Sequence, residues 1–120
     1  MIPSFYGGGV NVCELCNYKA EHLEVHVYAE IKDGRLFISG HDLGPNVKAF
    51  WSSDEYEYFY NLTATDTDRL YNLLKADSKI DAELLELIKL HFSDLDGCEN
   101  FRKYCKKHNM LFSFDNHFSI

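Results

Sequence analysis

The clearest periodic pattern in the chain lies between residues 22 and 31, where polar and apolar side chains alternate at every position. The apolar members are Leu23, Val25, Val27, Ala29 and Ile31. Successive side chains of a strand point to opposite faces, so this alternation predicts a strand with one buried face. Asp33-Gly34 follows it and is typical of a two-residue hairpin turn. That turn would pair Ile31 with Leu36 and Ala29 with Ile38, which gathers the aliphatic side chains on one face.

A second alternating segment spans Glu55–Leu62 and separates aromatic from acidic side chains. One face of the expected strand carries Tyr56, Tyr58, Tyr60 and Leu62, and the other carries Glu55, Glu57, Phe59 and Asn61. Beside the hairpin, the tyrosine face is best interpreted as core. The opposite face would then expose carboxylates and one aromatic ring.

The C-terminal half changes from strand to helix periodicity. Thr65 with Asp68, and Ser78 with Asp81, resemble capping boxes at the start of two helices, and Asp96-Gly97 would begin a third. The residues spaced along one face of each expected helix are Leu70, Leu73 and Leu74, then Leu84, Leu87, Ile88 and His91, and last Cys98, Phe101, Cys105 and His108. Asn109 is a plausible left-handed helix stop, and residues 110–115 predict a last short strand.

These elements predict an α+β fold in a single domain of residues 1–120. The expected architecture is a small antiparallel sheet, made of the Asp33-Gly34 hairpin and the Glu55–Leu62 strand, with about three helices packed on one face. The first twenty residues contain Gly7-Gly8-Gly9 and are expected to form an irregular lead-in.

The charge balance narrows the classes of partner. The chain has 120 residues, with 12 Lys and Arg against 19 Asp and Glu, which gives a net charge of −7 at neutral pH. Such a charge repels phosphate backbones and disfavours nucleic-acid binding, whereas it suits a basic protein partner. Solubility alone is the alternative explanation. The sequence shows no apolar run long enough for a membrane span and no signal peptide, so we expect no membrane association and a cytoplasmic location.

The pair Cys13 and Cys16 has the C-x-x-C spacing of metal knuckles and redox motifs. A zinc site needs further ligands, but His22 and His26 would stand roughly 13 Å apart along a strand, so at most one could join the cysteine pair. Cys98, Cys105 or His108 could also complete such a site. Without a secretion signal, we expect reduced, buried thiols and no cofactor, with a zinc or thiol-dependent site at Cys13 and Cys16 as the alternative.

No pattern of a catalytic site is present. The sequence has neither a Gly-x-Ser-x-Gly elbow nor a His-Glu-x-x-His helix. Neither Cys13 nor Cys16 has a histidine partner in a known catalytic motif. His41-Asp42 is the one histidine with a carboxylate directly after it, and adjacent residues rarely point the same way. We therefore expect a protein that is not an enzyme.

The acidic side of the predicted sheet is the candidate partner-binding surface. Its residues are Glu24, Tyr28, Glu30, Asp54, Glu55, Glu57 and Phe59. The carboxylates would receive a basic partner, and the two aromatic side chains would supply flat apolar contact. A solvated sheet face without a partner is the alternative.

Three segments of the chain carry a resemblance. Gly40-His41-Asp42-Leu43-Gly44, the Glu55-Tyr56-Glu57-Tyr58 stretch before a Leu-rich helix, and the phenylalanine-rich Leu111-Phe112-Ser113-Phe114 resemble a group of small, mostly uncharacterised bacterial proteins. In size, acidity and lack of an active-site motif, the chain is also similar to immunity proteins of bacterial toxin systems, including contact-dependent growth inhibition. That likeness implies a protein that neutralises a cognate toxin domain by covering it.

Overall fold

The computed structural model describes residues 12–51 and 53–118, so the predicted Gly7-Gly8-Gly9 loop lies outside the described residues. In chain order the elements are β1 (Val12–Lys19), β2 (Glu24–Lys32), β3 (Arg35–Leu43), α1 (Pro45–Trp51), β4 (Glu55–Leu62), α2 (Ala64–Leu73), α3 (Asp81–Phe92), α4 (Gly97–Lys107) and β5 (Phe112–Phe118).

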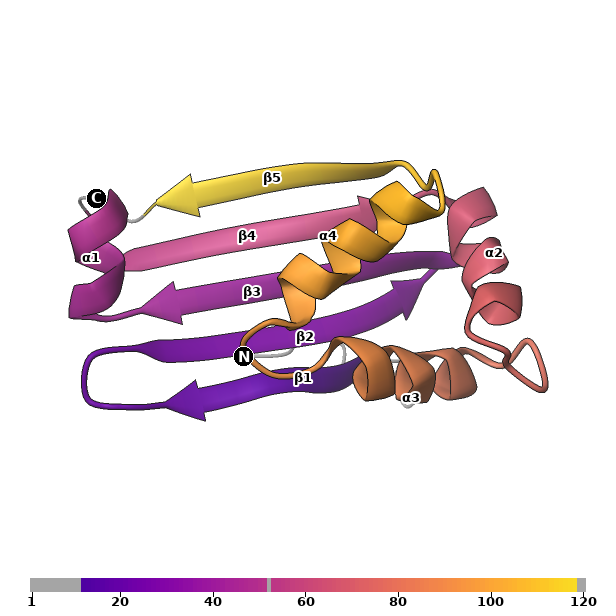
Figure 1. The fold of residues 1–120 in the computed structure, drawn as a ribbon, viewed down its shortest axis with the longest axis horizontal. Coiled ribbons are helices and arrows are strands. Elements are labelled where there is room, and N and C mark those ends of the chain that lie inside the picture. The colour runs from indigo at the N-terminus through magenta and orange to yellow at the C-terminus, as the bar shows by residue number, and fades with distance from the viewer. Residues whose placement is uncertain (1–11, 52, 119–120) are drawn as a thin grey trace.

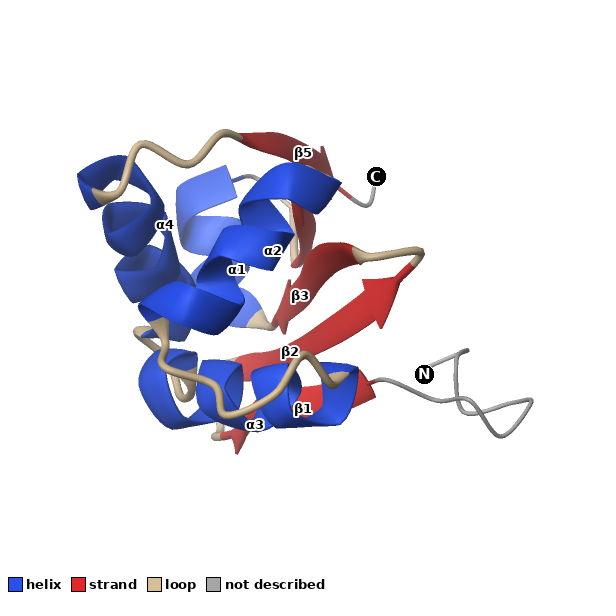
Figure 2. Ribbon diagram, turned by 90° about the vertical axis from the view of Figure 1, so that its right-hand side faces the viewer, coloured by secondary structure: helices blue, strands red, loops and turns tan. Residues whose placement is uncertain are grey.

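The strands form one five-stranded antiparallel sheet in the order β1-β2-β3-β4-β5, so every strand pairs with its sequence neighbour. The helices of the described residues all lie on one side of this sheet (Figure 2). Helix α4 crosses the middle of the sheet, α3 runs along its β1 side, α2 lies at one end, and α1 lies at the other end (Figure 1). The predicted α+β class is confirmed, with a larger sheet than the sequence indicated.

The predicted hairpin is confirmed in turn and register. Asp33 and Gly34 both have positive φ, at 52° and 74°, as a two-residue type I′ turn requires. Lys32 pairs with Arg35, and the expected partners Ile31–Leu36 and Ala29–Ile38 lie opposite each other. Local turn chemistry alone therefore determines the register of β2 and β3.

Strand β1 corrects the expected irregular lead-in, because residues 12–19 are regular strand. The alternation was hidden by a bulge: the pairing passes from Glu14–Tyr28 directly to Cys16–Val27, and Leu15 is the extra residue. Leu15 and Cys16 are consequently both buried, at 4% and 5% exposure. A strict period of two cannot reveal a strand with two adjacent inward positions.

The tyrosine strand packs as predicted. Tyr58, Tyr60 and Leu62 of β4 are buried, and Tyr56 packs partly exposed against the same core. β4 pairs with β3, and Gly40 of β3 lies directly opposite Tyr58. A Cβ at Gly40 would overlap the Tyr58 ring, so the missing side chain is what lets this tyrosine lie flat on the sheet.

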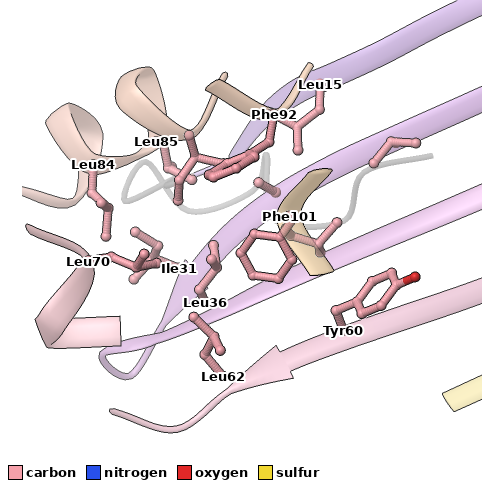
Figure 3. Packing of buried hydrophobic residues seen from close by; sticks show 14 of the residues in the cluster. Leu15, Ile31, Leu36, Tyr60, Leu62, Leu70, Leu84, Leu85, Phe92 and Phe101 are labelled. Atoms are coloured by element: carbon pink, nitrogen blue, oxygen red, sulfur yellow. The ribbon is translucent and has the colours of Figure 1, made fainter. Parts of the chain in front are cut away.

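The core lies between the sheet and the helices (Figure 3). Leu84, Leu85 and Phe92 of α3 and Phe101 of α4 point toward the aliphatic side chains of β2 and β3. Burying one such side chain fully stabilises the fold by roughly 1.5–3 kcal/mol. Thr67 of α2 adds a polar tie, since its hydroxyl donates to Thr63 O and accepts from Leu36 N at 2.8 and 3.0 Å.

Two of the helix starts differ from the predicted capping boxes. The N-cap of α2 is Thr63, whose hydroxyl accepts from Asp66 N at 3.1 Å, two residues before the predicted cap at Thr65. Ser78 does not cap α3; it donates to Glu83, whose carboxylate also accepts from Asp77 N. α4 begins at the predicted Gly97, and Asn109 has the left-handed φ of 54° expected after its end.

The last strand occupies Phe112–Phe118, which begins later and ends later than the predicted residues 110–115. It pairs with β4 from Tyr56–Phe118 to Leu62–Phe112 and forms one edge of the sheet. Within the described part of the chain, no helix is both long and apolar enough to cross a membrane.

Candidate functional site

The sheet face opposite the helices is here called the open face (Figure 2). Alternation along the strands places most of the predicted partner-binding residues on it. The inner face carries Val25, Val27, Ala29 and Ile31 of β2 and the tyrosines of β4. Alternation then places Glu24, Tyr28 and Glu30 of β2 on the open face, together with Glu55, Glu57 and Phe59 of β4.

Register arranges the open face in rows that run across the strands. One row joins Lys19, Glu24, Leu43 and Glu55; the next joins Asn17, His26, His41, Glu57 and His117; a third joins Glu14, Tyr28, Ser39, Phe59 and Asp115. Directly opposite residues in neighbouring strands interact through their side chains. Three histidines therefore lie in one row beside the row of carboxylates.

Hydrogen bonds connect the two rows. His26 Nε2 lies 2.9 Å from Glu24 Oε2, and His41 Nε2 lies 2.9 Å from Glu55 Oε1. The hydrogen bond from His26 lowers the pKa of Glu24 below its ordinary value. His117 stands next to Glu57, and its ring meets Phe59 edge-on at 5.8 Å between centroids.

The centre of the open face is hollowed, with a volume of about 630 Å³. Its lining combines aromatic rings, imidazoles and carboxylates: His26, Tyr28, Glu30, Lys32, Phe37, Ile38, Ser39, Gly40, His41, Glu57, Phe59 and Asn61. Concave surfaces with apolar walls and a few polar groups are typical of binding sites. The hollow lies on a wide face, which suits a protein surface better than an enclosed small molecule.

The structure does not gather every predicted residue into one acidic patch. Glu24 and Glu55 flank Leu43 and are two strand spacings apart, about 10 Å. Glu30 belongs to the row of Phe37 and Asn61, toward the opposite end of the strands. Asp54 lies in the bend before β4 and not on the strand that carries Glu55 and Glu57.

The alternation of β2 already placed His26 on the polar side of its strand, but the candidate surface did not include it, and His41, His117 and Phe37 were not assigned to this face. Phe37 and His41 alternate with Leu36 and Ile38 along β3, and their side chains therefore point to the opposite face of the sheet. The hairpin pattern could thus have assigned both residues to the open face. His117 could not be placed in this way, because its strand was predicted to end before it. Only the pairing of β5 with β4 brings His117 opposite Glu57.

The cysteines lie on the other side of the sheet. Cys13 pairs with Ala29 and Cys16 with Val27, both inner-face positions, whereas His26 is on the open face and cannot join them. Burial raises the pKa of Cys13 to about 11 and raises that of Cys16 as well. Among the described residues, no group of three or more His, Cys, Asp or Glu side chains could hold a metal ion.

Comparison of the chain with known protein families, with characterised proteins and with solved structures found no match.

Proposed function

We propose that this chain is a non-enzymatic, cytoplasmic interaction protein, and specifically an immunity protein that neutralises a cognate bacterial toxin domain by covering it. The observation that carries the proposal is the open face, an entire side of a five-stranded sheet that no helix of the described residues covers. A sheet with one face packed and one face free has a large surface for a partner.

The chemistry of the open face supports a basic partner. Glu57 is exposed at the hollow, and Glu24 and Glu55 lie in the next row. Together with the net charge of −7, these carboxylates would steer a cationic surface toward the sheet and speed association. Tyr28 and Phe59 supply flat rings of the kind that anchor protein interfaces.

The proposed mechanism is steric. A toxin domain bound across the hollow would have the cationic groups around its active site paired with carboxylates and shielded from substrate. No reaction by the immunity protein is required, and the affinity would come from apolar contact at the rings with charge setting orientation and rate.

Co-expression with a toxin tests the proposal. We expect the gene next to that of this protein to encode a larger protein whose C-terminal domain is toxic when expressed alone. Co-expression of this chain should restore growth, and the two products should co-purify. Toxicity that persists with the chain present, with no complex formed, would contradict the proposed function.

Charge reversal tests the assigned face. Glu55→Lys with Glu57→Lys should slow association with the toxin domain at least tenfold at low salt, and added salt should reduce the difference. Glu86→Lys with Asp77→Lys is the matched control, since both residues are exposed on or beside α3 and change the net charge equally. Equal effects of the two pairs would show that net charge matters and this face does not.

A further inference from the structure

The two edges of the sheet differ in whether another strand could be added. At the β1 edge, the bulge at Leu15 interrupts the strand, and Leu15 O accepts a hydrogen bond from Asp94 N at 2.9 Å. Bulges and covering loops are the means by which proteins protect edge strands from pairing. The β1 edge is therefore blocked at its middle.

Within the described part of the chain, the β5 edge has neither a bulge nor a covering loop. Seven consecutive residues pair with β4 without a register shift, and no segment within residues 12–51 and 53–118 pairs with the other side of β5. Asn116 N donates to the carboxylate of Asp115 at 2.9 Å and so does not serve the ladder to β4. Because N–H directions alternate along a strand, the main-chain groups of Phe112 and Phe114 face the free edge together with those of Asn116.

A cleft of about 540 Å³ lies beside this edge, between α4 and strands β4 and β5. We call it the aromatic cleft; its walls include Tyr56, Tyr60, Phe112, Phe114, Glu99 and Arg102. Phe114 is 46% exposed although its ring lies 4.9 Å from that of Tyr60. Side chains of β5 that face the cleft belong to the same residues whose main-chain groups face the free edge.

An edge with free main-chain groups next to a pocket for alternate side chains is the arrangement that binds extended peptides. We propose that the β5 edge accepts an extended, cationic segment of a partner protein as a sixth strand, with alternate large apolar side chains of that segment in the aromatic cleft. This goes beyond the function proposed above, since it uses a different surface and does not require the partner to be a toxin.

Charge decides between a foreign segment and a second copy of this chain. Two copies would each bring a net charge of −7, and full overlap of two antiparallel β5 strands would place Asp115 opposite itself. A segment with lysines beside Asp115 meets the opposite charge.

The test uses the intact protein and a blocked seven-residue peptide that alternates lysine and phenylalanine. Fluorescence anisotropy gives the affinity, and amide chemical shifts locate the site. We expect shifts at Phe112, Phe114 and Asn116. Two further peptides are N-methylated, one at its lysines and the other at its phenylalanines, so each lacks the main-chain N–H groups along one of its two edges. At least one of them should bind tenfold more weakly than the parent peptide. A peptide that alternates glutamate and phenylalanine should also bind at least tenfold more weakly.

Variants of β5 supply the matched comparison. Asn116→Pro removes an N–H that faces the free edge, which is bonded to the Asp115 carboxylate here and would transfer to the added strand. The substitution leaves the ladder to β4 intact, so it should weaken binding of the lysine–phenylalanine peptide about tenfold. Asn116→Ala keeps the N–H and should change the affinity less than twofold. Thermal unfolding of both variants reports whether the fold is retained, and the methylated peptides test the same edge on the unaltered protein.

Three outcomes would overturn the proposal. The first is equal binding of both methylated peptides and the parent peptide. The second is peptide shifts confined to Glu55 and Glu57, which would place binding on the open face. The third is a dimer in sedimentation that Asn116→Pro abolishes, which would make a second copy the occupant. Loss of peptide binding at β5 would leave neutralisation through the open face untouched, so the two proposals fail separately.

Discussion

The two faces of one sheet come from the same strands and differ in almost every physical property. On the inner face, β2 contributes Val25, Val27, Ala29 and Ile31, all of them buried. One residue further along, the same strand presents Glu24, His26, Tyr28 and Glu30 to the open face. The inner face is held by packing, and the open face is a layer of imidazoles, carboxylates and rings. Stability should therefore depend on one face and binding on the other.

The largest difference between the faces should appear when one ring is removed from each. Phe101→Ala empties a position that is 1% exposed and should lower the free energy of unfolding by about 3–5 kcal/mol. Phe37→Ala on the open face should cost about 1 kcal/mol, mainly the contact with Arg35, whose guanidinium lies 5.5 Å from the ring centre. Urea unfolding measures both. Equal losses would mean that the open face carries core-like packing.

The thiols buried on the inner face should also react slowly. Burial raises the pKa of Cys13 to about 11 and those of Cys98 and Cys105 to about 12. A rise from 9.0 to about 11 lowers the thiolate fraction at pH 8 roughly a hundredfold, so native alkylation should be that much slower than alkylation in urea. Fast native labelling of Cys13, or stoichiometric zinc that a Cys13→Ser variant loses, would instead favour a metal or thiol-dependent role.

A methyl group added at Gly40 should give a further difference in stability between the two faces. Gly40→Ala puts a Cβ into the Tyr58 ring and should destabilise by about 1–3 kcal/mol, as overpacking does. Ser39→Ala is the control next to it, on the open face, and should stay within about 0.5 kcal/mol of the parent. If thermal unfolding gives both variants the same midpoint, Tyr58 does not need the space above Gly40.

Asp42 is the inner-face carboxyl, and its effect should be smaller. Tyr58 OH donates to Asp42 Oδ1 at 2.8 Å, and burial raises the pKa of Asp42 above its ordinary value. Asp42→Asn keeps an acceptor without the charge and should be no less stable than the parent at pH 7, whereas Asp42→Ala should cost about 1 kcal/mol.

The pH dependence of this variant follows from the direction of the shift. A raised pKa in the folded state means that ionised Asp42 disfavours folding above that pKa, and the penalty disappears as pH falls below it. Any advantage of Asp42→Asn should thus shrink as pH is lowered from neutral toward 3.8. An advantage that grows with acidity would contradict burial as the cause.

The smallest effect should come from the half-buried pair of His26 and Glu24 on the open face. The bond from His26 lowers the pKa of Glu24, so Glu24 contributes to stability above its unfolded-state value of 4.5, and the contribution is lost as pH falls through the lowered pKa. Glu24→Gln should therefore lower the midpoint of unfolding slightly at neutral pH and leave it unchanged in strong acid. A shift as large as that of Gly40→Ala would show that this pair is structural.

The hairpin and the tyrosine strand were predictable because their patterns are local. Asp33-Gly34 favours a two-residue hairpin turn, and that turn fixes the register in which β2 and β3 pair. The period of two then assigns each side chain to one face of the sheet. Glu55, Glu57 and Phe59 were assigned to the same face as Glu24, Tyr28 and Glu30, and the structure places them so. Asp54 was included only because it adjoins Glu55 in sequence.

Strand β1 and the histidine row were not predictable in the same way. The bulge at Leu15 breaks the period in β1, and it is defined only by pairing with Tyr28 and Val27 of another strand. The row from His26 to His117 spans four strands, of which the last begins fifty residues after β4 ends. No local pattern encodes that neighbourhood.

The sequence by itself determined which side of each alternating strand is buried, where the hairpin turns, and the acidity of the whole molecule. These are properties of adjacent residues and of composition. Tertiary structure alone decided which strand of the hairpin β4 pairs with, that β5 completes the sheet, and that one edge is bulged while the other is straight. The reason is that strand order and edge exposure depend on hydrogen bonds between segments far apart in the chain, and no pattern of adjacent residues specifies these pairings.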